Sequence, residues 1–173
     1  EGSLLELFVC TSNEGLAAGK ACWEGRSDNS LIDYLNEELG MSYRHLKALL
    51  LQLLKGERDE GDAVDEDAVA AHVEALHKEC SKGMMSNFDE DAVIAIIAAN
   101  NTTHNVAVAA AYEAEYSKSL SKALKKKCGK KFHSALDGLL ISKADFVARR
   151  LNKAMKGWGA DKGALARLLG GLD

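Results

Sequence analysis

A chain of 173 residues with 47% hydrophobic and 28% charged residues is long enough to bury a core and has an ordinary globular balance. The net charge of −4 argues against bulk nucleic-acid binding, and no apolar run approaches the ~18 residues of a membrane span. The four cysteines form no C-x-x-C pair, and no signal peptide is visible. Free thiols in a reducing compartment are therefore favoured over disulfides or a metal, and we expect a cytoplasmic protein whose membrane contact is peripheral.

Apolar residues recur at helical spacing along almost the whole chain, and proline is absent, so the sequence predicts an all-α fold. Residues 55–67 are polar and are predicted to link two copies of one unit, whereas residues 83–88 are predicted to form a loop. In chain order, the predicted helices have their apolar residues within 4–8, 31–39, 46–54, 69–76, 93–97, the alanine-rich stretch from 104 to 116, 120–124, 132–140, 146–155 and 165–169.

The sequence also repeats. The stretch that begins at Ser3 aligns without a gap with the stretch that begins at Ala92, a constant shift of 89 residues, and this shift places Leu35 on Leu124. A third, partial copy follows at a shift of 72 residues and places Asp89 on Asp161. Repetition on this scale indicates stacked copies of one supersecondary unit. The predicted units are residues 1–60, truncated at the N-terminus, residues 61–142, which are complete, and residues 143–173, the first part of a further unit.

Three strings connect these units to a known family. Residues 146–161 read FVARRLNKAMKGWGAD and resemble the annexin stretch FAxRLxxAMKGxGTD. Residues 35–40 (LNEELG) resemble the turn between the fourth and fifth helices of an annexin repeat, and residues 55–60 (KGERDE) resemble the end of the second repeat. The resemblance covers the whole chain as most of repeat two, all of repeat three and the start of repeat four. It implies a right-handed bundle of five helices per repeat and calcium-dependent attachment to acidic phospholipid.

The resemblance also implies where calcium would bind. In annexins, the loop between the first two helices of a repeat offers backbone carbonyls, and a later Asp or Glu completes the shell of oxygens that calcium requires. In the last unit these carbonyls are those of Met155, Gly157 and Gly159, although Ala160 stands where the family usually has Thr. In the first unit the acidic residue is Glu38. Neither unit contains both halves of a site within this chain.

The complete middle unit departs from the family in both halves. Its loop reads GMMSNFD from Gly83 to Asp89, and the shift of 89 residues places Lys127 opposite Glu38. Because an ammonium group repels calcium, we expect no family-type calcium site here. Residues 89–91 (DED) either cap the next helix or form a weaker site, and the cap is the favoured interpretation.

Cationic and aromatic residues suggest direct lipid contact. A lysine cluster surrounds the turn that faces the membrane in annexins, which suggests calcium-independent binding to acidic lipid. A solvated run of charge is the alternative. Trp158, between two glycines, is expected to lie at the lipid interface. The lysines predicted to contact lipid are Lys125, Lys126, Lys127, Lys130 and Lys131.

These observations predict a peripheral membrane-binding module with calcium as its cofactor and an acidic phospholipid surface as its partner. The alternative is a helical-repeat scaffold, with a protein or cytoskeletal partner and degenerate calcium sites. No recognisable nucleophile motif is present, so we predict no enzyme activity, and we expect no nucleic-acid partner. Exposed apolar faces suggest that copies of the chain could associate as a homo-oligomer.

Overall fold

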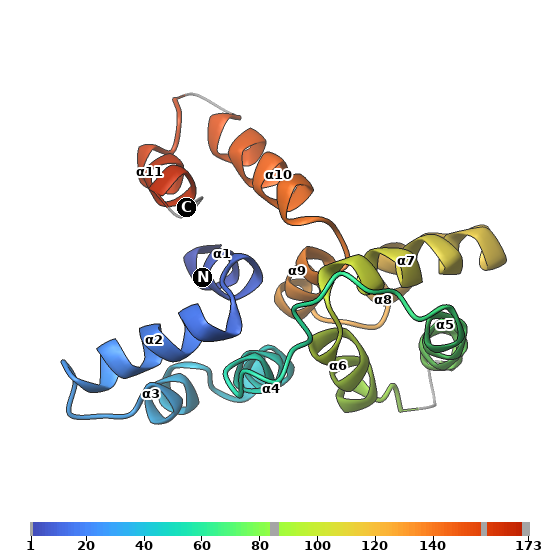
Figure 1. The fold of residues 1–173 in the computed structure, drawn as a ribbon, viewed down its shortest axis with the longest axis horizontal. Helices are drawn as coiled ribbons and strands as arrows, with labels where there is room; N and C mark the ends of the chain where they lie inside the picture. Colours follow the sequence, from blue (N-terminus) through green and yellow to red (C-terminus); the bar gives the residue numbers. More distant parts are fainter. Residues whose placement is uncertain (1, 84–86, 157–158, 171–173) are drawn as a thin grey trace.

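The computed structural model describes residues 2–83, 87–156 and 159–170, and these residues form α-helices, one short 3-10 helix and connecting turns (Figure 1). No strand occurs among them. The all-α prediction is therefore confirmed. Within these three stretches, no helix is both long and apolar enough to cross a bilayer.

The middle unit contains the five helices that the repeat predicts. Its first and third helices lie along each other, and the short fourth helix packs between the third and the fifth. The helices are α5 (Glu66–Ser81), α6 (Glu90–Ala99), α7 (Thr102–Tyr116), α8 (Leu120–Lys125) and α9 (Lys130–Leu139).

The first unit repeats the last four of these helices, and the last unit repeats the first two. One of them, α2, was not predicted from the sequence, because its apolar stripe is weak and Leu16 is its only side chain that is fully buried. The helices are α1 (Gly2–Cys10), α2 (Asn13–Glu24), α3 (Leu31–Glu38), the 3-10 turn η1 (Met41–Tyr43), α4 (Arg44–Leu53), α10 (Lys143–Met155) and α11 (Lys162–Gly170).

The helix starts show that the copies share local chemistry. Ser12 at the start of α2 and Asn101 at the start of α7 both accept a hydrogen bond from a backbone N–H three residues later, at 3.1 and 2.7 Å. Ser30 and Ser119 do the same for α3 and α8, at 3.0 and 3.4 Å. Both pairs are 89 residues apart, so equal cap positions confirm the internal repeat.

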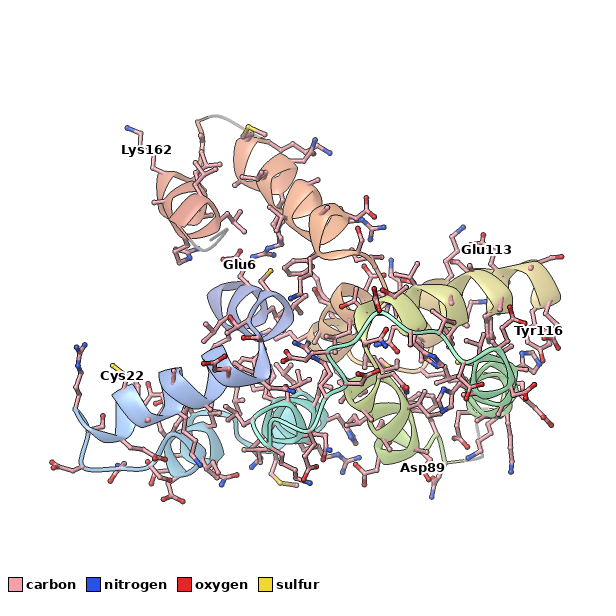
Figure 2. The ribbon with its side chains drawn as sticks, in the orientation of Figure 1. Glu6, Cys22, Asp89, Glu113, Tyr116 and Lys162 are labelled. Atoms are coloured by element: carbon pink, nitrogen blue, oxygen red, sulfur yellow. The ribbon has the colours of Figure 1, made fainter. Side chains whose placement is uncertain are left out.

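The units form one continuous core. Helix α4 packs against both α6 and α9, and α1 packs against α9 and α11. Figure 2 shows Glu6 on α1 directed towards α10 and α11. Its carboxylate accepts a hydrogen bond of 2.8 Å from Arg150 Nε and lies 3.5 Å from Arg167 Nε. The first and last units, remote in sequence, are therefore joined by an ion-pair network as well as by apolar packing.

The predicted linker is ordered against both units. Arg58 is buried, and its Nη2 donates to the carbonyl of Thr11 at 2.9 Å. The next residue, Asp59, donates its backbone N–H to the carbonyl of Ala99 and accepts a hydrogen bond of 2.7 Å from Asn101. The linker thus fastens the turn before α2 to the turn before α7.

Candidate calcium and membrane-binding site

The loops of the middle unit lie beside the turn before α4. The α5–α6 loop (82–89) and the α8–α9 turn (126–129) are in contact, because Lys127 donates a hydrogen bond to the carbonyl of Lys82. His45 Nε2, on α4, lies 3.1 Å from Glu90 Oε1 at the start of α6. We call the end of the molecule formed by residues 39–45, 82–83, 87–90 and 125–131 the loop face.

The hydrogen bond from Lys127 bears on the prediction that the middle unit lacks a calcium site of the annexin type. The ammonium group occupies the position equivalent to the carboxylate of Glu38 and binds a carbonyl of the α5–α6 loop. In annexins the equivalent loop offers its carbonyl oxygens to calcium. Here the ammonium group of Lys127 binds one of these oxygens instead. Among the described residues of this loop, the cation disfavours a calcium ion of that type, and the lack of a calcium site in the middle unit stays a prediction.

Two acidic residues of this region have structural roles. Glu79 is buried, and its Oε2 accepts hydrogen bonds from Lys82 Nζ at 2.6 Å and from the backbone N–H of Asp89 at 2.8 Å. The bond from Lys82 is the main reason that the pKa of Glu79 lies below its usual value. Asp89 caps α6 by accepting from Ala92 N–H at 3.0 Å, so the cap interpretation is supported.

The thiols near this loop cannot serve as ready metal ligands. Burial raises the pKa of Cys80 to about 11 and that of Cys128 to about 12. Both groups therefore remain protonated near neutral pH, whereas metal binding and nucleophilic attack need the thiolate. Across the described ranges, no three His, Cys, Asp or Glu side chains converge to hold a metal ion. A calcium site built from the described residues would therefore combine backbone carbonyls with fewer than three such side chains.

The α10–α11 loop has a backbone suited to that task. The backbone N–H of Asp161 donates to the carbonyl of Ala154 at 2.8 Å and closes the loop at its base. Gly159 has a φ of +94°, which side chains disfavour, so glycine is required there. Met155 is 59% exposed, whereas Gly157 and Trp158 lie outside the described residues. The assignment of the carbonyls of Met155, Gly157 and Gly159 to calcium stays a prediction.

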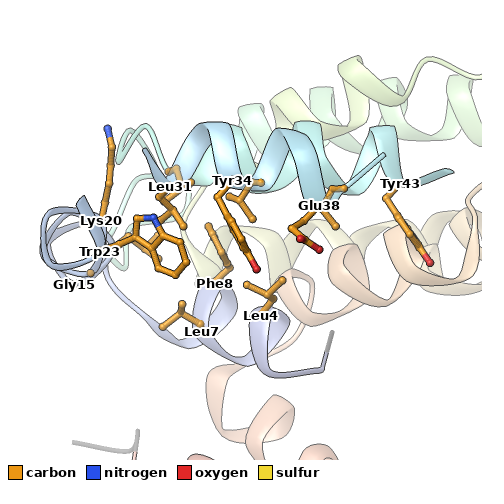
Figure 3. Close-up of a pocket in the computed structure, with 15 residues that line it drawn as sticks. Leu4, Leu7, Phe8, Gly15, Lys20, Trp23, Leu31, Tyr34, Glu38 and Tyr43 are labelled. Atoms are coloured by element: carbon orange, nitrogen blue, oxygen red, sulfur yellow. The ribbon is translucent and has the colours of Figure 1, made fainter. Parts of the chain in front are cut away.

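Glu38 ends α3 and is exposed to solvent. It lies at the edge of an apolar groove of about 460 Å³ that α1, α2 and α3 enclose (Figure 3). The rings of Trp23 and Tyr34 meet in this groove with centroids 4.9 Å apart. By the shift of 89 residues, the loop that would face Glu38 corresponds to residues before the first one printed. Glu38 therefore supplies one half of a possible site.

The structure divides the predicted lysine cluster. Lys125, Lys126 and Lys130 are exposed, whereas Lys127 is turned to Lys82. Lys131 donates to the hydroxyl of Tyr43 at 2.8 Å and lies 4.3 Å from the centroid of that ring. The cluster is thus three exposed cations and two that tie structural elements together.

Comparison with known proteins shows which proteins this chain is similar to. An annexin family model matches residues 72–139. Human annexin A13 is 33% identical over 172 residues, which cover 98% of this chain and 53% of that protein. The chain is thus similar to annexins over almost its whole length. The structure of annexin III aligns with a TM-score of 0.85 and 22% identity, over 97% of this chain and 52% of that one. That of calcium-bound annexin (Sm)1 aligns with a TM-score of 0.76 and 20% identity, over 96% of this chain and 51% of that one.

The chain spans about half the length of these annexins. The match covers all three units, which confirms the predicted annexin-like repeat fold. The sequence did not predict two features of this annexin-like loop face. The first is the bridge from Lys127 to Lys82, and the second is the brace from Glu79 to Asp89. The sequence did contain a signal for the brace from Glu79, because Glu79 and Lys82 are three residues apart at the end of a helix and can pair.

Proposed function

We propose that the chain is a peripheral membrane-binding module that attaches to acidic phospholipid through its loop face. The module acts in the cytoplasm. Exposed Lys125, Lys126 and Lys130 supply a calcium-independent attraction, which is worth ~1 kcal/mol per cation near an anionic surface and is weakened by salt. In this proposal Lys127 and Lys131 position the loops, and any direct lipid contact through them stays a prediction.

The calcium-dependent part rests on the loop that contains Gly159. The carbonyls of Met155, Gly157 and Gly159 would hold the ion, which would in turn bridge the loop to lipid phosphate. Glu38 would supply the carboxylate in the first unit. Neither half has its partner among the described residues, so water and lipid phosphate oxygens would complete the shell around the ion. Trp158 would insert at the lipid interface.

The observation that carries the proposal is the chemistry of the loop face. Three exposed lysines gather around the α8–α9 turn of a chain whose net charge is −4. The side chain of Met41, within residues 39–45 of the same face, is exposed and offers an apolar contact. A surface that combines cations with an exposed apolar side chain suits the headgroup region of an acidic bilayer.

Co-sedimentation with vesicles tests the proposal. We expect the protein to pellet with vesicles of phosphatidylcholine and phosphatidylserine in EGTA at low salt, and more strongly with calcium. Vesicles of phosphatidylcholine alone are the control and should leave it in solution. Absence of pelleting in every condition would favour the scaffold alternative, whose partner would be a protein. The proposal assigns no catalytic role.

A further inference from the structure

A second, smaller cavity lies between the units. It has a volume of about 300 Å³ and forms where α1, α4, α9 and α10 meet. Its floor is apolar and includes Leu4, Leu46 and Leu50. Helix α10 reaches it near the C-terminal end and α9 at the N-terminal end, so it opens beside the loop face. A cavity of this size is at the lower end of the range for small-molecule sites.

The rim of the cavity is strongly basic. Four cations line it, namely Lys130, Lys131, Arg150 and Lys153, and no acidic residue is among the described residues that do so. This concentration of positive charge is unusual in a chain whose net charge is −4. Charge complementarity therefore points to an anionic occupant.

Two of the four cations are already oriented. Arg150 is held by Glu6, whose carboxylate offsets its charge, and Lys131 is held by the hydroxyl of Tyr43. Lys130 and Lys153 are exposed and come from different helices, α9 and α10. These two ammonium groups are the ones able to move onto a ligand at little cost, because neither has a buried partner to lose.

The apolar floor narrows the class of anion. Inorganic phosphate would use the cations and leave the leucine side chains against water. An acidic phospholipid uses both, because its phosphate meets the ammonium groups while the glycerol and first methylene groups cover the leucines. The volume suits this part of a lipid and not a whole acyl chain.

The geometry points to a calcium-independent binding site in this cavity for the phosphate end of one acidic phospholipid. The inference rests on the proposed function, which it deepens by naming a lipid site between the repeats and apart from the calcium loops. Lys130 and Lys153 are the residues that contact the phosphate. The hydroxyl group of Ser134, which also lines the cavity, adds a donor.

Matched double variants test the site. Lys130→Ala with Lys153→Ala removes two exposed cations at the cavity, and Lys125→Ala with Lys126→Ala removes two exposed cations from the same cluster away from it. In EGTA, we expect the cavity pair to weaken binding to phosphatidylserine vesicles about tenfold more than the control pair. Equal losses would show that only overall charge matters and would overturn the site while leaving the proposed function intact.

A soluble lipid separates the cavity from the membrane. In methyl NMR of the wild-type protein, short-chain phosphatidylserine below its micelle concentration should shift the methyl signals of Leu46 and Leu50, and inorganic phosphate should not. Shifts with both ligands would mean an anion site without lipid specificity, and shifts with neither would overturn the inference. If the methyl signals shift but the protein does not pellet with vesicles, the lipid site in the cavity would be supported and the proposed membrane binding would be rejected.

Discussion

Glu38 and Lys127 are 89 residues apart, at equivalent positions of the first and middle units, and they carry opposite charges. Glu38 is exposed at the edge of a groove, and no described loop lies opposite it. Lys127 is half-buried and donates to the carbonyl of Lys82 in the α5–α6 loop. In the proposed function the first unit therefore offers half of a calcium site, whereas in the middle unit Lys127 links the two loops with its own cation.

The helix packing differs in the same two places. In the middle unit α5 lies along α7, while the equivalent face of α2 borders the open groove. Residues at matching positions thus have the same backbone but different surroundings. The two units therefore share the positions of their helices and helix caps. The charges and contacts of their loops differ.

The largest expected effect contrasts two matched core residues. Leu124 and Leu35 are equivalent and both buried, but only Leu35 borders the groove. We expect Leu124→Ala to lower the free energy of unfolding by about 3 kcal/mol, and Leu35→Ala by about 1 kcal/mol less, because its truncation leaves no closed cavity. Urea unfolding measures both values. A larger loss at Leu35 would contradict the contrast between the two units.

Replacing Lys127 by Met should have the next largest effect. The change removes a hydrogen bond from a charged donor, and we expect a loss of about 1 kcal/mol because the site is only half-buried. Amide hydrogen exchange should become faster in the described parts of the α5–α6 loop. Glu38→Met is the matched control and should change stability by less than about 0.5 kcal/mol. Equal effects at the two positions would mean that the bridge contributes nothing.

The loop of the last unit can be perturbed through its backbone. Gly159→Ala should lower stability by about 1 kcal/mol, because alanine disfavours a φ of +94° although no atom lies within 4 Å of the added carbon. It should also weaken calcium-dependent vesicle binding. Gly163→Ala, within α11, is the control; it should preserve calcium-dependent binding and should not lower stability, because alanine favours a helix more than glycine does. Full calcium-dependent binding by Gly159→Ala would remove this loop from the proposed site.

The smallest effect concerns pH and only the middle unit. His72 Nδ1 lies 2.9 Å from His104 Nε2, and burial, together with this neighbour, lowers the pKa of His72, while Asp65 opposes the shift. The unfolded chain then binds more protons below pH ~6.5, so stability should fall as the pH drops below that value and stay level above it. The first unit has Gly15 at the position of His104, so this histidine pair belongs to the middle unit alone. His72→Gln should therefore flatten the dependence of stability on pH. An unchanged dependence would mean that another group causes it.

Much of the fold could be predicted from the sequence. Strong apolar periodicity placed α4, α6 and α9, and the apolar stretches within 31–39 and 146–155 placed α3 and α10. Helix α2 was missed because its few large apolar residues form a weak stripe. The linker was predicted as a polar connection, but its order depends on the burial of Arg58 against a turn 47 residues away.

The candidate site divides in the same way. The sequence alone determined the repeat, the resemblance to annexins and the exchange of Glu38 for Lys127, because periodicity, caps and charge are local properties of the chain. Tertiary structure decided which lysines face solvent, what Lys127 binds, and that Lys130 and Lys153 share one cavity. These outcomes depend on side chains from separate helices meeting in space, and spacing along the chain does not encode such distances.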